Sequence, residues 1–281
     1  MAGVTRGPRR VRRDLVGKVV LVTGAAGGLG AALCRCFAAR GARIAATDRD
    51  AAGLEVLVAE LRAGGSEALA IPGDIADPAA CIDAMRGTLD HFGALDGLIN
   101  NAGISARSLL VDTDPAVIRR VMEVNFFGAA NLTRAALNAI LARRGFIVAI
   151  SSVAGFSPLT GRTAYAASKH ALHGFFDSLR SEVEGSGVSV TLVCPSFIRT
   201  GIGSAATDGS GAPVSGSRVT TGGESTPVQI AQRILDAVVS GKELLLPDAT
   251  SRKAWWLSRL APGLYARVMK RRVGGEFPGL S

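Results

Sequence analysis

Two side chains suited to proton transfer, Tyr165 and Lys169, stand four residues apart in the segment YAASK. In a helix this spacing places both side chains on one face, one turn apart. A phenol is a poor base at neutral pH because its reference pKa is about 10, but a fixed ammonium group beside it favours the phenolate. The pair therefore predicts a group that takes a proton from an alcohol, or gives one to a carbonyl, near neutral pH.

The elements that must position this pair follow from an alternation of apolar runs and helical segments. Strands are predicted at residues 18–23, 43–48, 67–72, 95–100, 145–151, 188–194 and 243–246. Helices are predicted at 28–40, 51–63, 78–92, 114–141, 162–184 and 227–240. Such alternation with short loops is typical of an α/β fold with a doubly wound parallel seven-stranded sheet and helices on both faces. We expect one domain over residues 14–250.

The basic charges of the 281-residue chain are concentrated at its two ends. Residues 1–13 hold five arginines and no acid, residues 252–272 hold seven basic residues and no acid, and the part between is nearly neutral. A nucleic-acid-binding domain would carry its basic patch on the folded body, so we expect no nucleic-acid partner. We interpret residues 1–13 as a disordered basic leader, because no apolar segment follows them as it would in a secretory signal.

Neither a metal site nor a membrane-spanning helix is predicted. The four cysteines are scattered through apolar contexts and form no CxxC pair, and the three histidines are not spaced for zinc. The chain contains no apolar run of about 18 residues. Reduced cysteines without a secretory signal indicate a cytoplasmic protein.

A glycine-rich segment, TGAAGGLG, occupies Thr23 to Gly30 between the first predicted strand and the first predicted helix. In such a segment Gly24 would permit a tight turn, Gly28 would let a pyrophosphate approach the backbone, and Gly30 would let helix and strand pack closely. The helix would then face the phosphates with unpaired N–H groups and the positive end of its dipole. The segment predicts a dinucleotide site.

Two acids refine the prediction of the dinucleotide. Asp48 ends the second predicted strand, where a carboxylate can bond both ribose hydroxyls and would repel a 2′-phosphate. The glycine segment contains no Lys or Arg, so NAD is favoured over NADP, although Arg49 could bind a phosphate if Asp48 turned away. Asp74 follows the third strand, where it could bond the adenine amino group or cap the next turn.

One long segment interrupts the alternation. Residues 196–225 are rich in Gly, Ser, Thr and Ala and show little apolar periodicity. Long irregular segments of compact domains are usually functional lids or disordered. Because this one follows the carboxyl end of a strand, where open α/β sheets bind ligands, we expect a lid over the substrate.

Residues 251–281 form a C-terminal extension in which Trp, Leu and Tyr alternate with Arg and Lys at helical spacing between 254 and 272. Pro262 and Gly263 divide this stretch into two short helices. We expect an amphipathic extension that covers the pocket of its own subunit or of a neighbour, or that rests on a membrane surface. Either use would suit an apolar or lipid-like alcohol or ketone.

The order of these segments resembles that of the short-chain dehydrogenase/reductase family over residues 18–200. Residues 23–30 are similar to the family's TGxxxGxG motif, residues 100–103 to its NNAG motif, and Tyr165 with Lys169 to its YxxxK motif. The resemblance implies a single-domain Rossmann fold and a dehydrogenase that acts on CH–OH groups with NAD. It also implies a homodimer or homotetramer.

The resemblance assigns roles to individual residues. Ser152, which precedes Tyr165 by 13 residues, would be the catalytic serine, and Asn125 would hold a catalytic water that connects Lys169 to solvent. Lys169 would also bond the nicotinamide ribose. The implied cofactor contacts are Thr23, Gly24, Ala26, Gly28, Leu29, Gly30, Asp48, Arg49, Asp74, Ile75, Asn101, Ala102, Gly103, Tyr165, Lys169, Pro195 and Thr200.

One sequence departure, three apolar residues and the function itself each allow a second interpretation. The family often has PGxxxT after the sixth strand, whereas this chain has PSFIRT, and Ser196 in the glycine position has less backbone freedom. Phe156, Leu159 and Phe197 are candidates for the substrate pocket or for the core. The alternative function is a non-catalytic dinucleotide-binding regulator on the same fold, which would not need the serine, tyrosine and lysine at their catalytic spacing.

Overall fold

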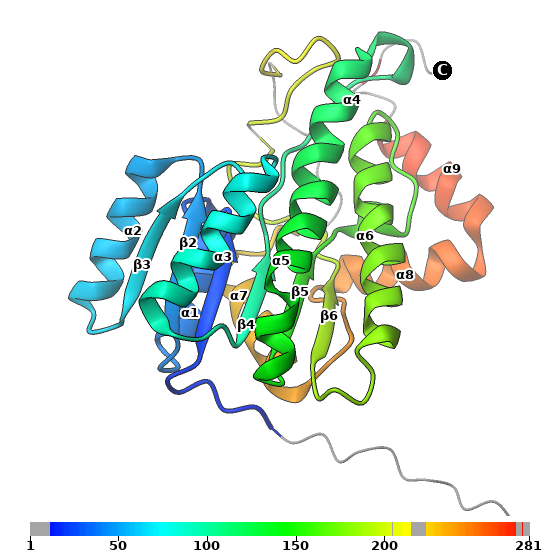
Figure 1. Cartoon of the computed structure of the whole chain (residues 1–281). Helices are drawn as coiled ribbons and strands as arrows, with labels where there is room; N and C mark the ends of the chain where they lie inside the picture. Colours follow the sequence, from blue (N-terminus) through cyan, green and yellow to red (C-terminus); the bar gives the residue numbers. More distant parts are fainter. Residues whose placement is uncertain (1–11, 204, 215–222, 274–276, 278–281) are drawn as a thin grey trace, which may run out of the picture.

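The computed structural model describes residues 12–203, 205–214, 223–273 and 277, and within them seven strands form one parallel sheet (Figure 1). Of the expected leader over residues 1–13, only residues 12 and 13 are described. The sheet order is β3-β2-β1-β4-β5-β6-β7, which confirms the predicted fold class. The strands are β1 Val19–Thr23, β2 Arg43–Asp48, β3 Ala68–Pro72, β4 Gly97–Asn100, β5 Phe146–Ile150, β6 Ser189–Val193 and β7 Leu244–Leu245.

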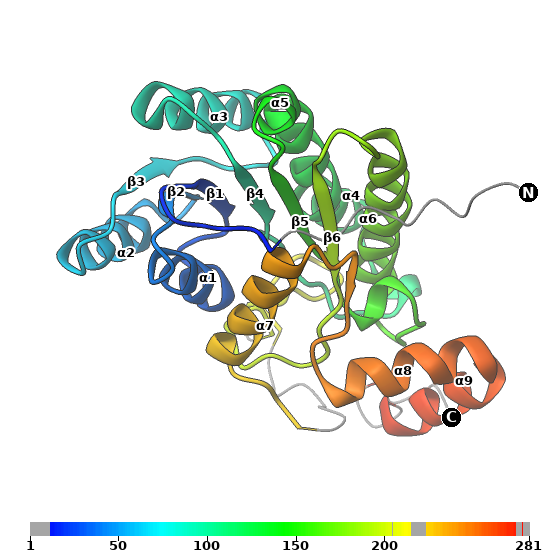
Figure 2. The same cartoon turned by 90° about the horizontal axis from the view of Figure 1, so that it is seen from below.

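Helices cover both faces of the sheet (Figure 2). On one face lie α1 Gly28–Ala38, α2 Ala51–Ala63 and α7 Pro227–Ser240. On the other lie α3 Pro78–Phe92, α5 Gly128–Ala142 and α6 Thr163–Glu182. Both faces of the central strands are therefore buried, which explains why β1 and β5 are continuous apolar runs, VVLVT and FIVAI.

The helix predicted over residues 114–141 is divided by a turn of π-helix. α4 (Pro115–Met122) begins after Asp114, whose side chain accepts the N–H of Ala116. A π-helical turn, Glu123–Phe127, then separates α4 from α5. A π turn inserts one residue into the helix and is often found at functional sites. The apolar pattern of the sequence continues through the turn and gave no sign of it.

Two further helices follow the sheet. α8 (Ala249–Leu260) and α9 (Pro262–Val273) meet at the predicted break and project from one corner of the molecule (Figure 2). They pack on the short turn η3 (Val153–Gly155) through Ala254 and Tyr265. α8 and α9 therefore lie against the carboxyl end of the sheet.

None of the helices in the described part of the chain is both long enough and apolar enough to cross a bilayer.

Candidate active site

A cavity of about 760 Å³ lies along the carboxyl ends of the strands. Segments that follow β1, β2, β3, β4, β5 and β6 all contribute to its wall. The strand order reverses between β1 and β4, and crevices at such reversals are where open α/β sheets bind ligands.

The glycine segment forms one end of this cavity. Gly24 has a φ of +63°, and a Cβ atom there would lie 2.8 Å from the Cα of Ala102. A Cβ at Gly30 would overlap the carbonyl oxygen of Gly24, so the first turn of α1 can approach the loop only with glycine at that position. The sequence predicted that Gly30 lets the helix pack closely on the strand. In the structure its close contact is with the glycine loop instead.

The N terminus of α1 is open to the cavity. Its N-cap, Gly27, has no side chain to accept an N–H, whereas α2, α3, α4, α7 and α8 each begin at an Asp or Thr whose side chain does so. Gly28, Leu29 and Gly30 of this first turn line the cavity. Such a terminus suits an anion, and the residues therefore fit the pyrophosphate of a dinucleotide.

Asp48 stands beside the glycine loop at the end of β2. Its carboxylate accepts the N–H groups of Ala26 and Asp50, each at 3.0 Å. A carboxylate has about four acceptor positions, so two remain for hydroxyl groups of a ligand. Asp48 and Arg49 both line the cavity.

Asp74 has the capping role, one of the two that the sequence left open. Its carboxylate accepts the N–H of Ala76, which caps a turn, and it also lines the cavity. Arg120 on α4 donates to the same carboxylate at 2.7 Å. Burial raises the pKa of Asp74, but the hydrogen bonds from Arg120 and Ala76 outweigh it and hold the pKa below its usual value. This pairing could not be predicted from the sequence, because 46 residues separate the partners.

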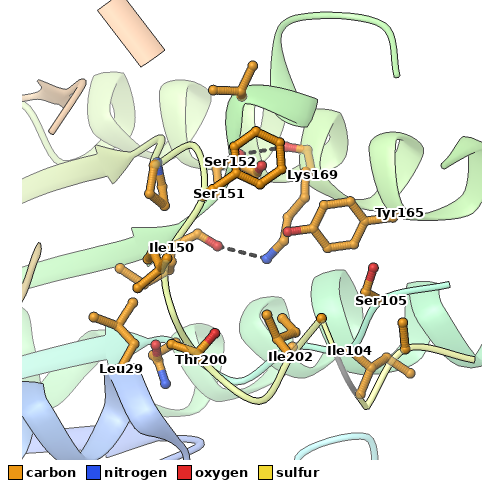
Figure 3. A pocket seen from close by; sticks show the side chains of 18 of the residues that line it. Leu29, Ile104, Ser105, Ile150, Ser151, Ser152, Tyr165, Lys169, Thr200 and Ile202 are labelled. Atoms are coloured by element: carbon orange, nitrogen blue, oxygen red, sulfur yellow. Dashed lines mark hydrogen bonds between the residues drawn. The ribbon is translucent and has the colours of Figure 1, made fainter. Parts of the chain in front are cut away.

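Tyr165 and Lys169 lie on α6 and point into the same part of the cavity (Figure 3). The Nζ atom of Lys169 is 5.7 Å from the centre of the Tyr165 ring and donates to the carbonyl of Ile150 at 2.8 Å. Only 3% of Lys169 is exposed, and this burial lowers its pKa to about 8. At neutral pH the group therefore remains an ammonium, held beside the phenol by a strand carbonyl.

Ser152 borders the same space at the end of β5 (Figure 3). Its Oγ atom accepts the N–H of Ala154 at 3.2 Å, so it caps the turn that follows. A hydroxyl that accepts one bond can still donate its own proton. Ser152 can therefore both shape the turn and donate to an oxygen atom in the cavity.

Asn125 lies behind the cavity, in the π turn. Its side chain accepts the N–H of Ile104 at 2.8 Å and donates to the carbonyl of Ile104 and to the hydroxyl of Ser168. Both amide protons are thus used. A Cβ at Gly103 would lie 3.2 Å from the Asn125 Oδ1 atom and 3.5 Å from the Lys169 Nζ atom. Asn125 therefore fixes the loop that borders the lysine.

His173 contacts the cavity wall through Ser151. Its Nε2 atom is 3.0 Å from the Oγ atom of Ser151, which in turn donates to the carbonyl of Lys169. Burial lowers the pKa of His173 to about 4. The imidazole is therefore neutral near pH 7, and His173 is not among the residues that line the cavity.

Most of the predicted site residues line the one cavity. Thr23, Ala26 and Asn125 are the exceptions; Thr23 and Asn125 accept N–H groups of cavity loops, and the N–H of Ala26 bonds Asp48. The Thr23 hydroxyl accepts the N–H groups of Asn101 and Ala102. The predicted residues in the wall are Gly24, Gly28, Leu29, Gly30, Asp48, Arg49, Asp74, Ile75, Asn101, Ala102, Gly103, Ser152, Tyr165, Lys169, Pro195 and Thr200.

The segment expected to be a lid runs along the cavity. Its described residues from 196 to 206 include nine that line the wall, whereas residues 204 and 215–222 lie outside the described part. Phe197 and Leu159 belong to the wall, whereas Phe156 packs on Trp255 with ring centres 4.8 Å apart. Thr200 contributes to the wall beside Gly28, where a Cβ would lie 3.3 Å from the threonine Cγ2 atom.

Ser196 explains the departure from the PGxxxT pattern. Its N–H and hydroxyl bond the carboxylate of Asp248 at 3.0 and 2.7 Å. The same carboxylate accepts the N–H of Ser251 and caps α8. A glycine at position 196 could not make the hydroxyl bond, so the serine ties the start of this segment to α8.

The C-terminal helices close the far end of the cavity. Most of the side chains that they contribute are apolar, and they come from Ala254, Leu257, Tyr265, Val268 and Met269. The expectation that the extension covers the pocket of its own subunit agrees with this arrangement. The sequence indicated the two helices but not which of their residues face inward, because the periodicity fits more than one orientation.

Comparisons with known proteins agree with this geometry. The family model described as "short chain dehydrogenase" matches residues 18–210. A bovine (Bos taurus) protein, "Dehydrogenase/reductase SDR family member 7B", is 43% identical over 95% of this chain and 85% of its own. An Anopheles gambiae relative, "Dehydrogenase/reductase SDR family protein 7-like", is 39% identical over 94% of this chain and 86% of its own.

A solved structure also superposes on this chain. It is a short chain dehydrogenase/reductase SDR from Burkholderia phymatum in complex with NAD, with a TM-score of 0.81 and 25% sequence identity. The similarity covers 90% of this chain and 96% of that one.

Proposed function

The chain belongs to the short-chain dehydrogenase family, and from its site we propose that it interconverts a secondary alcohol and a ketone by hydride transfer with NAD. The observation that carries this proposal is the placement of the Lys169 ammonium 5.7 Å from the centre of the Tyr165 ring. Both side chains line the cavity that the glycine loop also forms. A phenol with a fixed cation beside it is a proton donor and acceptor of the strength that this chemistry needs.

The cofactor would lie along the strand ends. The open N terminus of α1 would hold the pyrophosphate, Asp48 the adenosine ribose, and Asp74 the adenine. The preference for NAD is supported by the Asp48 carboxylate, by the absence of a basic residue from the glycine segment, and by the NAD bound to the Burkholderia phymatum relative. When bound, the nicotinamide supplies a carbon that takes a hydride from the alcohol or returns it to the carbonyl.

The protein's own residues would handle the proton. Tyr165 as phenolate would accept the hydroxyl proton of the alcohol, and in the reverse direction its hydroxyl would donate to the carbonyl oxygen. Ser152 would donate to the same substrate oxygen and hold it in place, which lowers the entropic part of the barrier. Lys169 would keep the phenolate favoured by charge.

Proton exchange with solvent would pass beside Asn125. Its side chain is committed to Ile104 and Ser168, so we propose that a water would be held by the main chain of the π turn. A π turn leaves carbonyl groups outside the regular helical pattern, which makes such a contact available. The water would connect Lys169 to solvent.

The substrate would be apolar or lipid-like. This follows from the far wall of the cavity, where α8 and α9 contribute Leu257, Val268 and Met269. A volume of about 760 Å³ is within the range of small-molecule sites and must hold both cofactor and substrate. Steroid and long-chain secondary alcohols should therefore be turned over in preference to sugar alcohols, as followed by NADH absorbance. No turnover with any member of such a panel would favour the non-catalytic alternative.

The change Asp48→Asn is expected to weaken NAD binding and to reduce the discrimination against NADP. Asparagine keeps an oxygen for the Ala26 N–H but removes the charge that would repel a 2′-phosphate. Hydrogen bonds to a charged group contribute about 1.5–3 kcal/mol, so the NAD affinity should fall by roughly 10- to 100-fold. Calorimetric titration with each cofactor measures both effects.

Asp50→Asn is the matched control, because Asp50 caps α2 and is not part of the cavity wall. It should leave both affinities unchanged. Tighter binding of NADP than of NAD to the wild-type protein would contradict the assignment of Asp48.

A further inference from the structure

The outer side of the C-terminal helix pair carries large apolar side chains in contact with solvent. Trp256 and Leu260 lie one turn apart on α8, and Leu264 lies in the first turn of α9. Their exposed fractions are 62%, 77% and 47%. Elsewhere in the described chain, exposed large hydrophobic side chains occur singly or as one adjacent pair. These three residues are called the outer apolar stripe below.

Within the described chain, only the inner side of the α8–α9 helix pair is buried by packing. Ala254 and Tyr265 are 8% and 4% exposed and belong to a small core with Val153. Trp255 packs on Phe156, and the guanidinium of Arg259 lies 3.2 Å from the centre of the Trp255 ring. Trp255 is therefore held against the body, while Trp256, the next residue, faces solvent.

The charge of the same helices has one sign. Residues 249–273 contain seven Lys and Arg residues and no Asp or Glu. Those with described side chains are exposed, and they are Arg252, Lys253, Arg259, Arg267, Lys270 and Arg271. The charged residues of the two helices that carry the outer apolar stripe are thus all basic.

We propose that the outer apolar stripe docks on the anionic surface of a lipid bilayer. Amphipathic helices with Trp and Leu on one face and Lys and Arg around it bind in the headgroup region of membranes. Each basic residue near an anionic leaflet contributes about 1 kcal/mol, and a tryptophan is favoured at the interface.

Other occupants agree less well with these observations. A symmetric contact with a second copy would place the cations of one helix pair against the same cations of the other, which is unfavourable. A nucleic acid would use the cations, but its phosphates would give no reason for three exposed apolar side chains.

The docking would place the cavity beside the membrane. The helix pair that carries the stripe also supplies Leu257, Val268 and Met269 to the cavity wall. An alcohol or ketone dissolved in the bilayer would then reach the site over a short path. This consequence rests on the proposed function, whereas the docking itself does not.

Co-sedimentation of the full chain with lipid vesicles tests the proposal without cofactor or substrate. We expect binding to vesicles of phosphatidylcholine mixed with phosphatidylglycerol, weaker binding as salt is added, and little binding to phosphatidylcholine alone. The triple change Trp256→Ser, Leu260→Ser and Leu264→Ser should lower the affinity at least about tenfold, because it removes apolar surface that would be buried in the headgroup region.

Matched variants distinguish a role of the outer apolar stripe from a general loss of exposed apolar surface or of positive charge. The triple change Val56→Ser, Val111→Ser and Val228→Ser alters equally exposed apolar residues elsewhere and should bind as the wild type does. Replacing Arg267, Lys270 and Arg271 by Gln should weaken binding more than replacing the exposed Arg40, Arg86 and Arg119 by Gln, although both remove three charges.

Three outcomes would overturn the proposal. The first is no binding of the wild type to anionic vesicles at low salt, and the second is an equal loss of binding in the valine variant. The third is a change of oligomeric state in the stripe variant, measured by sedimentation equilibrium, which would assign the stripe to a second copy. Because the assay needs no turnover, its result is independent of whether an alcohol substrate is found.

Discussion

The Tyr165→Phe protein is expected to lose nearly all turnover while binding NAD as the wild type does. The change removes one hydroxyl from the cavity wall and leaves the ring, so packing on α6 is preserved. General acid–base catalysis contributes about 10²–10⁴-fold to a rate, and kcat should fall by that factor. Steady-state NADH formation and calorimetric titration with NAD measure the two quantities.

Tyr265 offers a matched control, because it is the other tyrosine of the chain. Tyr265→Phe removes the same hydroxyl from α9, on the helix-pair wall of the cavity. We expect kcat to stay near the wild-type value in this variant. Substantial turnover by Tyr165→Phe would contradict the assignment of the proton to this residue.

Lys169→Met is expected to lower kcat by roughly 100-fold or more, because the phenolate of Tyr165 loses its neighbouring cation. Methionine has a similar length and occupies the same buried space. The exposed Lys242→Met, which follows α7, is the control for loss of a lysine charge and should keep full activity.

The same variant should alter how stability depends on pH. Burial lowers the pKa of Lys169 from 10.5 to about 8. Between pH 8 and 10.5 the unfolded chain binds a proton at this lysine that the folded protein does not, so the free energy of unfolding rises with pH in this window. With Tyr165→Phe in both proteins, so that no phenolate holds the lysine proton, the protein with Lys169 should gain up to about 3 kcal/mol across it relative to Lys169→Met. Parallel curves for the two proteins, measured by urea unfolding, would contradict the burial of a charged lysine.

The fold could be predicted from the sequence because local patterns determine it. Apolar runs such as VVLVT, glycine or proline at the ends of elements, and Asp caps each define an element without reference to distant residues. The order of strands and helices then limits the sheet to few topologies. The π turn at residues 123–127 was missed because the apolar period runs through it unchanged.

The candidate site could be predicted where its residues belong to short motifs. The glycine loop, Ser152, Tyr165 and Lys169 are of this kind. Arg120 could not be found, because its partner Asp74 is brought near only by the packed fold. The bond between Ser196 and Asp248 was missed for the same reason, since 52 residues separate the two.

At the wall formed by α8 and α9, the periodicity of the sequence predicts the helices but not which side faces the cavity. The alternation of apolar and basic residues predicted amphipathic helices, but both sides of these helices carry apolar residues. The folded structure is needed to tell Leu257, which lines the cavity, from Leu260, which is 77% exposed.

The phenol of Tyr165 is expected to give up its proton more readily than a free tyrosine, because Lys169 stands beside it. Carbon-13 NMR of protein labelled at the tyrosine Cζ atom tests this directly, since the chain has two tyrosines and the Phe variants assign both signals. Burial raises the pKa of Tyr265, so its signal should titrate above that of free tyrosine. We predict that the Tyr165 signal titrates at a pH below that of free tyrosine and moves upward in Lys169→Met. A Tyr165 signal that titrates at or above the pH of free tyrosine, and that Lys169→Met leaves unchanged, would contradict the account.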